Sequence, residues 1–212
     1  GYVIANKLKD ITPMPKLNLP KYNTGLVSKT KRVALTFDDG PHPTVTQQIL
    51  KSLSKYNAKA TFFVTGRNSS RYPAVLKEIS VAGHEIGNHT YDHVKLTAIS
   101  VKAAKQQIDA TNKAIESAIG NKATVFRPPY GAYNDLTRQQ TTLPFVLWSV
   151  DTLDWKHRDA NKILQIITSN TKNGSIILMH DIHQPTANGL DAVLHYLSMQ
   201  GYEFVTVSEI LQ

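Results

Sequence analysis

The sequence predicts an α/β protein built on a mainly parallel sheet, either open or closed into a barrel. Short apolar stretches of strand length alternate along the chain with segments whose apolar residues recur at helical spacing. Strands that alternate with helices are typical of parallel sheets, because a parallel neighbour is reached through a crossover connection. The 212 residues, 41% of them hydrophobic, are enough to bury a core.

The first thirty residues are rich in Pro, Asn and Lys and differ in this from the rest of the chain. Such a composition indicates an arm or linker. We therefore expect residues 1–30 to be an N-terminal arm or linker and residues 31–212 to form one domain. No internal repeat and no second domain is evident.

The elements of this domain follow from periodicity and from end signals. Ile49 and Leu53 lie on one face of a first helix, Gly83 ends a second helix, and Gly120 ends a long third one. In chain order, strands are predicted at 32–37, 60–64, 85–87, 124–126, 145–150, 175–179 and 202–207, and helices at 44–56, 73–81, 98–119, 160–168 and 190–199.

Charge and composition narrow the class of protein. The net charge of +8 suits an anionic neighbour, but the lysines are scattered, and we favour a solubilising surface over nucleic-acid binding. The chain has no cysteine, so disulfides and thiolate metal sites are excluded. Its apolar runs are too short to span a bilayer. Because the chain starts at Gly1 without an initiator Met, we expect a fragment of an exported or membrane-anchored protein.

Polar side chains follow most of the predicted strands. They are Asp38 and Asp39, His89 and His93, Arg127, Asp151 and Asp154, and His180. In a (β/α) barrel the carboxyl ends of the strands form one rim, where such sheets carry their chemistry. The sequence therefore predicts that these residues converge.

Asp38-Asp39 and the pair His89 and His93 predict a metal site. One carboxylate and two imidazoles make a three-ligand set that leaves a position open for water, as in catalytic metal centres. We expect the histidines, four residues apart, to share one face of a helical turn. Consecutive residues of a strand point to opposite faces, so the second carboxylate would be free to act as a base. The alternative is that Asp-Asp-Gly-Pro is only a turn after a strand.

Two other histidines, His84 and His195, are interpreted as structural.

Three further motifs complete a recognisable series. They are Arg127-Pro128-Pro129-Tyr130, Asp151-Thr152-Leu153-Asp154-Trp155 and Leu178-Met179-His180. Together with the first two motifs, their order and spacing resemble the polysaccharide deacetylase family of carbohydrate esterases (the NodB-homology domain). The resemblance extends from about Lys31 to the C-terminus. It is strongest to streptococcal and lactococcal peptidoglycan N-acetylglucosamine deacetylases.

The resemblance implies a distorted (β/α) barrel of seven or eight parallel strands with the active site at its C-terminal rim. It implies that Asp39, His89 and His93 hold a divalent metal, usually zinc, although cobalt, nickel or manganese can serve. Asp38 would be the base that takes a proton from water, and Arg127 would pair with it.

The same resemblance assigns the remaining roles. His180 would be the general acid, and Asp154 would orient it and favour its charged form. The backbone N–H of Tyr130 would stabilise the oxyanion. Trp155 and Leu178 would form a pocket for the acetyl methyl group, although ordinary core packing explains these two equally well.

The implied function is removal of N-acetyl groups from N-acetylglucosamine residues of peptidoglycan, with release of acetate. Chitooligosaccharide deacetylation and acetylxylan esterase activity stay open as alternatives. Two rivals belong to other classes: an iron(II) oxygenase, which two histidines and a carboxylate also suit, and a non-catalytic wall-binding module. We expect a monomer that acts on a polysaccharide without a protein partner, outside or at the surface of a Gram-positive cell.

Overall fold

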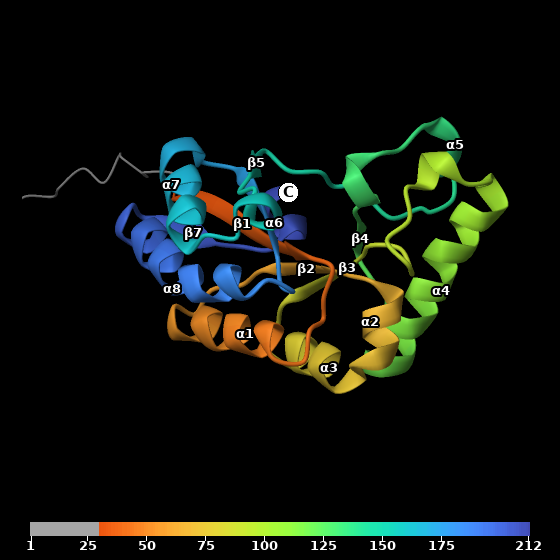
Figure 1. The fold of residues 1–212 in the computed structure, drawn as a ribbon, viewed down its shortest axis with the longest axis horizontal. Coiled ribbons are helices and arrows are strands. Elements are labelled where there is room, and N and C mark those ends of the chain that lie inside the picture. The colour runs from red at the N-terminus through yellow and green to blue at the C-terminus, as the bar shows by residue number, and fades with distance from the viewer. Residues whose placement is uncertain (1–29) are drawn as a thin grey trace, which may run out of the picture.

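Seven parallel strands form the sheet in the computed structural model, which describes residues 30–212 (Figure 1). Their order is β4-β3-β2-β1-β6-β5, and β7 pairs with β1 outside this path. The strands are β1 (Lys31–Asp38), β2 (Thr61–Val64), β3 (Glu85–Asn88), β4 (Val125–Phe126), β5 (Val150–Asp151), β6 (Ser175–His180) and β7 (Tyr202–Phe204). The predicted arm at residues 1–30 lies outside the described residues, except for Thr30.

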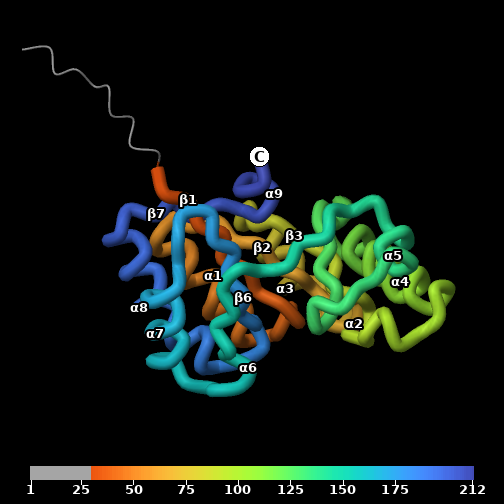
Figure 2. The backbone as a smooth tube through the Cα atoms, turned by 90° about the horizontal axis from the view of Figure 1, so that it is seen from above, coloured from red at the N-terminus to blue at the C-terminus, as the bar shows by residue number. Residues whose placement is uncertain are grey.

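Helices lie around the sheet (Figures 1 and 2). Helix α8 packs against α1 and α7, and α4 packs against α2 and α3. The helices are α1 (Val45–Lys55), α2 (Gly66–Arg71), α3 (Pro73–Val81), α4 (Val101–Ile119), α5 (Asp135–Arg138), α6 (Asp154–His157), α7 (Ala160–Asn170), α8 (Gln184–Met199) and α9 (Val207–Ile210), with 3-10 turns η1 (Leu96–Ala98) and η2 (Pro129–Gly131). In the described part of the chain, no helix has both the length and the apolar character needed to cross a membrane.

Strand β1 shows how alternation builds both the core and the site. Its odd-numbered residues Val33, Leu35 and Phe37 pack in the main hydrophobic core with side chains of α1 and α8. Since successive side chains of a strand alternate, Thr36 and Asp38 point to the other side of the sheet. On that side the Arg127 side chain donates to both residues, and Asp38 ends the strand there.

The sheet is not closed by a continuous ladder, and the predicted strand at 145–150 accounts for this. Phe145 makes an isolated parallel bridge to Phe126 of β4, and regular pairing with β6 begins only at Val150. Between these points the carbonyl groups of Val146 and Leu147 accept hydrogen bonds from the guanidinium of Arg127, at 3.1 and 2.8 Å. One side chain thus occupies the acceptors that a neighbouring strand would otherwise use, so the strand prediction was wrong for residues 146–149.

Other observed boundaries differ from the predicted ones, in two cases because a capping residue sets where a helix begins. The long helix begins at Val101 rather than at 98, because the Ser100 side chain accepts from the Ala103 N–H. The last strand ends at Phe204 rather than at 207, because Thr206 caps α9 in a capping box with Glu209. Helix α8 begins at Gln184, six residues before the predicted start at 190.

His84 has the structural role that its sequence position suggested. Its Nδ1 accepts a hydrogen bond from the Ala60 N–H at 3.2 Å, and its ring meets Phe62 edge-on at 5.4 Å between centroids. Burial, and next the charge of Lys59, lower the pKa of His84 to about 4. The ring is therefore neutral in the folded protein at neutral pH.

His84 should make stability depend on pH. Below its ordinary pKa of 6.5 the unfolded chain binds a proton that the folded chain does not bind until about pH 4. The free energy of unfolding should therefore fall as pH drops through this window, by roughly 1–3 kcal/mol for this residue. Urea unfolding of the wild type and of His84→Asn at pH 7 and pH 4.5 measures the effect, and the same pH dependence in both proteins would refute it.

Candidate active site

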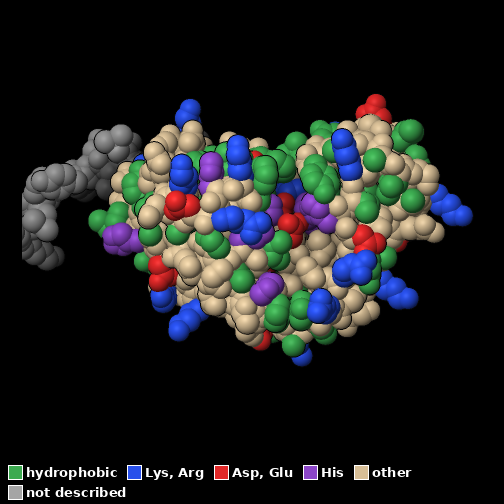
Figure 3. Space-filling view, in the orientation of Figure 1, with side chains coloured by type: hydrophobic (Ala, Val, Ile, Leu, Met, Phe, Trp, Pro, Cys, Tyr) green, Lys and Arg blue, Asp and Glu red, His purple; other side chains and the backbone are tan. Residues whose placement is uncertain are grey.

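A cavity of about 490 Å³ opens at the carboxyl ends of the strands. Acidic and histidine side chains gather in a hollow near the middle of the face seen in Figure 3. All five motifs contribute to its lining, which consists of Asp38, Asp39, His89, His93, Pro128, Tyr130, Trp148, Asp151, Trp155, Leu178 and His180. The predicted convergence on one rim therefore occurs, with Arg127 and Asp154 buried behind the lining.

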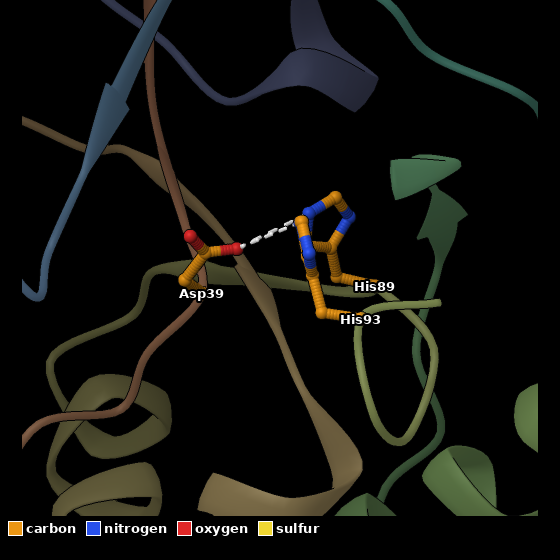
Figure 4. A group of neighbouring side chains, drawn as sticks. All are labelled: Asp39, His89 and His93. Carbon is orange, nitrogen blue, oxygen red and sulfur yellow. Dashed lines mark ion pairs between the residues drawn. The ribbon is translucent and has the colours of Figure 1, made fainter. Parts of the chain in front are cut away.

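Asp39, His89 and His93 form a compact group of ligand atoms (Figure 4). Asp39 Oδ1 lies 3.3 Å from His93 Nε2 and 3.4 Å from His89 Nε2. This oxygen is buried and has no hydrogen-bond partner within residues 30–212. A buried carboxylate oxygen without a donor is costly, and a cation between the three atoms would satisfy it. The residues therefore fit a divalent metal ion.

His89 is held in the form that a metal requires. Its Nδ1 lies 2.7 Å from the Arg127 carbonyl oxygen. A carbonyl can only accept, so Nδ1–H donates to it and the Nε2 lone pair faces Asp39. Although burial opposes the charged form, Asp38 and Asp39 together raise the pKa of His89. For His93, burial is the main cause of a lowered pKa.

The backbone that presents these ligands differs from the prediction. His89 and His93 lie in a loop rather than on a helical turn, and Thr90 and His93 have φ of 64° and 56°. Asp39 has φ of 80°, which ends the alternation of β1. As a result Asp38 Oδ2 also lies 3.5 Å from His89 Nε2, so the two carboxylates face one point and not opposite sides.

Left-handed backbone is concentrated around the cavity. Such conformations cost about 1–2 kcal/mol for residues other than glycine and persist where the surrounding structure imposes them. Non-glycine residues with positive φ in the described chain are Asp39, Asn57, Thr90, His93, Tyr130, Leu153 and Arg158. All except Asn57 lie on the loops that carry the site motifs or directly follow them.

Arg127 is completely buried and pairs with Asp38. Its Nη1 donates to Asp38 Oδ1 at 2.7 Å and to Thr36 Oγ1 at 2.8 Å. The guanidinium lies 4.0 Å above the centre of the Phe63 ring. Burial lowers the pKa of Arg127 and the charge of Asp38 opposes that shift. Because Asp38 Oδ1 is engaged by Arg127, Oδ2 is the carboxylate oxygen that faces the cavity.

His180 and Asp154 form a second charged pair. Asp154 Oδ1 lies 2.7 Å from His180 Nδ1, and Asp154 Oδ2 accepts from the His180 N–H at 2.8 Å and from Thr186 Oγ1 at 2.7 Å. Burial opposes ionisation of both partners. The hydrogen bond and the opposite charge outweigh it, so the pKa of His180 rises to about 9 and that of Asp154 falls.

The three residues expected to contact substrate all line the cavity. Trp155 is 49% exposed, so core packing does not explain it, whereas Leu178 is buried at 4% exposure. The Tyr130 ring is 68% exposed and meets the His93 ring edge-on, with 4.8 Å between centroids. Asp151 accepts from the Leu153 N–H at 2.9 Å and so caps the turn of the Asp-Thr-Leu-Asp motif.

Sequence reasoning missed Asp181, although it directly follows His180. Its carboxylate is completely buried and accepts from the Gly40 N–H at 3.0 Å and from Thr46 Oγ1 at 2.6 Å. Burial is the main cause that raises the pKa of Asp181 to about 7. A Cβ at Gly40 would lie 2.1 Å from this carboxylate, so only glycine fits after the acidic pair. Trp148 was also missed, because it lay in a predicted strand.

Comparison with known proteins agrees with this fold and identifies a family. A family described as Polysaccharide deacetylase matches residues 26–143. Peptidoglycan-N-acetylglucosamine deacetylase PgdA of Listeria monocytogenes is 45% identical over 180 residues, which are 85% of this chain and 39% of that protein. Peptidoglycan-N-acetylmuramic acid deacetylase PdaC of Bacillus subtilis is 43% identical over 206 residues, which are 97% of this chain and 44% of that protein.

A solved structure of peptidoglycan deacetylase PdaC from Bacillus subtilis superposes with a TM-score of 0.85 at 44% identity, covering 86% of this chain and 91% of that one. The unclosed parallel sheet, with its cavity at the carboxyl ends of the strands, is of the (β/α) barrel type found in carbohydrate esterases of this kind. The chain belongs to the polysaccharide deacetylase family. It spans less than half the length of the two curated relatives described above.

Metal binding should stabilise the fold through Asp39. A ligand that binds only the folded state adds about 2.7 kcal/mol at roughly 100 times its Kd. We expect zinc to raise the Tm of the wild type and to leave that of Asp39→Asn nearly unchanged. Differential scanning fluorimetry measures both, with the exposed Asp109→Asn as the matched control. An equal zinc-dependent shift in Asp39→Asn would contradict the assigned ligand set.

Proposed function

We propose that the chain removes N-acetyl groups from N-acetylglucosamine residues of peptidoglycan and releases acetate. One observation carries the proposal. Asp38 and His180 are register partners on the adjacent strands β1 and β6, and both line the cavity that contains Asp39, His89 and His93. A base, an acid and a metal-ligand group on one rim suit amide hydrolysis. The family and its relatives support the same reaction.

Asp38 is the proposed base. Arg127 holds Oδ1, so Oδ2 remains to accept a proton from the attacking water. A buried guanidinium at 2.7 Å also keeps the carboxylate in one orientation. Asp39, His89 and His93 are the proposed ligands of a divalent metal, for which zinc is expected and cobalt, nickel or manganese are alternatives. When bound, it would supply Lewis acidity toward the acetamide carbonyl and toward water.

His180 is the proposed general acid. Its Nδ1 is engaged by Asp154, so Nε2 is the nitrogen left to donate a proton to the departing sugar amine. A pKa of about 9 keeps the ring charged at neutral pH. Tyr130 is proposed to stabilise the oxyanion through its backbone N–H, and Trp155 and Leu178 to contact the acetyl methyl group.

The proposed setting is the bacterial cell wall. The printed names of the Listeria and Bacillus relatives describe peptidoglycan deacetylases. We therefore place the activity outside or at the surface of a Gram-positive cell, in a polypeptide that acts as a monomer on polysaccharide and requires neither a protein partner nor nucleic acid.

A second candidate is deacetylation of N-acetylmuramic acid. The relative named for this reaction is 43% identical over 97% of the chain. The two candidates use the same residues and differ only in which sugar of the repeating disaccharide occupies the cavity. Mass spectrometry of the digested glycan after reaction identifies the deacetylated sugar.

Acetate release from purified N-acetylated peptidoglycan tests the reaction. We expect release by the wild type, loss with a chelator, and recovery when zinc, cobalt or manganese is added back. Asp38→Asn should lower turnover by about 10²–10⁴-fold while zinc still raises its Tm, because the base is lost but the ligands remain. Chitopentaose and acetylated xylan serve as alternative substrates. Acetate release from none of the three would refute the proposal and favour the wall-binding module.

The pH profile should report the pair His180 and Asp154. The acid must be protonated, so activity declines as pH rises through its pKa. In Asp154→Asn the charge that raises this pKa is lost, and the alkaline limb of kcat/KM should move to lower pH by at least about one unit. The capping variant Asp159→Asn is the control and should keep the wild-type profile. An unmoved alkaline limb in Asp154→Asn would exclude His180 as the acid.

A further inference from the structure

A second hollow of about 590 Å³ adjoins the active-site cavity. It is lined by His93, Val94, Lys95, Ala98, Ile99 and Tyr130. His93 and Tyr130 also line the active-site cavity, so these two side chains form the wall between the hollows. A polymer whose acetamide group enters the first cavity can therefore place a neighbouring group in the second. We call the second hollow the Lys95 groove.

The wall between the hollows is held in a strained conformation. Tyr130 has φ of 61°, and the turn is closed by the Gly131 N–H, which donates to the Pro128 carbonyl at 3.0 Å. The exposed Tyr130 ring leans on the His93 ring at 4.8 Å. Strain of this kind is retained where the surrounding structure imposes it, and it clusters at binding sites. The exposed tyrosine thus lines both hollows, whereas Asp39 and His89 line only the first.

The chemistry of the Lys95 groove is simple. Val94, Ala98 and Ile99 give it an apolar floor, and the lysine is exposed. Lys95 forms no ion pair with any carboxylate in residues 30–212. An apolar floor with an unpaired cation suits a short aliphatic group that carries a carboxylate. Neither chitin nor acetylated xylan contains such a group, whereas the lactyl arm of muramic acid does.

We propose that the Lys95 groove binds the carboxylate-bearing arm of the muramic acid residue next to the N-acetylglucosamine in the cavity. The lactyl methyl group packs on the apolar floor, and Lys95 pairs with the carboxylate. On strands without peptides this is the lactyl carboxylate, and on substituted strands it is a carboxylate of the stem peptide. The inference rests on the proposed function and names Lys95 as the residue that selects peptidoglycan over neutral polymers.

Kinetics of Lys95→Met and Lys95→Glu test the proposal. The substrates are peptide-free glycan strands, the same strands with their lactyl carboxyl groups amidated, peptide-bearing strands, and chitopentaose. We expect Lys95→Met to raise KM for the peptide-free strands by about threefold to tenfold with kcat unchanged, and Lys95→Glu to raise it further. Amidated strands and chitopentaose should show no difference from the wild type. Lys102→Met, on the exposed start of α4, is the matched control.

Salt provides a second readout, since an exposed charge pair weakens as ionic strength rises. The difference in KM between wild type and Lys95→Met should shrink in 0.5 M NaCl, where the screening length falls to about a few ångströms. An unchanged KM in both variants, or an equal rise in KM for chitopentaose, overturns the inference. In either case, acetate release by the wild type leaves the proposed function intact. If the wild type releases no acetate, calorimetric binding of peptide-free strands to wild type and Lys95→Met still decides the inference.

Discussion

The buried guanidinium of Arg127 is the interaction on which the site and the sheet both depend. It orients Asp38, bonds Thr36 of β1, and occupies the carbonyl groups of Val146 and Leu147 where the ladder between β4 and β5 is absent. A buried charge is tolerated only when its donors are satisfied, and here carboxylate, hydroxyl and carbonyl oxygens share that work. The same side chain therefore orients Asp38 and links β1 to the segment that precedes β5.

The rest of the site follows from the parallel sheet. Because every strand ends at the same rim, Asp38 and His180 become neighbours although 142 positions separate them in the chain. Each of the two residues proposed to transfer a proton then has its own oppositely charged partner, Arg127 for Asp38 and Asp154 for His180. One carboxylate is paired with a cation and one imidazole with an anion, so the proposed base and the proposed acid each have an oppositely charged partner beside one cavity.

Most of the fold and the membership of the site could be predicted from the sequence. Strand alternation and helix periodicity are local signals, and the motif residues indeed line one cavity or support it. The failures have nonlocal causes. The predicted strand is absent at residues 146–149, where Arg127, about twenty positions away, donates hydrogen bonds to the carbonyl groups of Val146 and Leu147. His89 and His93 are brought together by a loop with left-handed residues and not by a helix. Asp181 was not predicted because the partners of its carboxylate, the Gly40 N–H and Thr46 Oγ1, lie 141 and 135 positions away in the sequence.

The left-handed residues around the cavity have a consequence for how such a protein can change. Six loop positions hold a conformation that most side chains resist, and the stability of the core and sheet sustains them. Glycine at Thr90 or Leu153 would relieve the strain, but it would also free a loop that now presents a ligand or a counter-charge at one angle. The sequence that makes this fold most stable is therefore not the sequence that best orders its site, because a substitution that relieves strain in these loops also loosens the side chains they present.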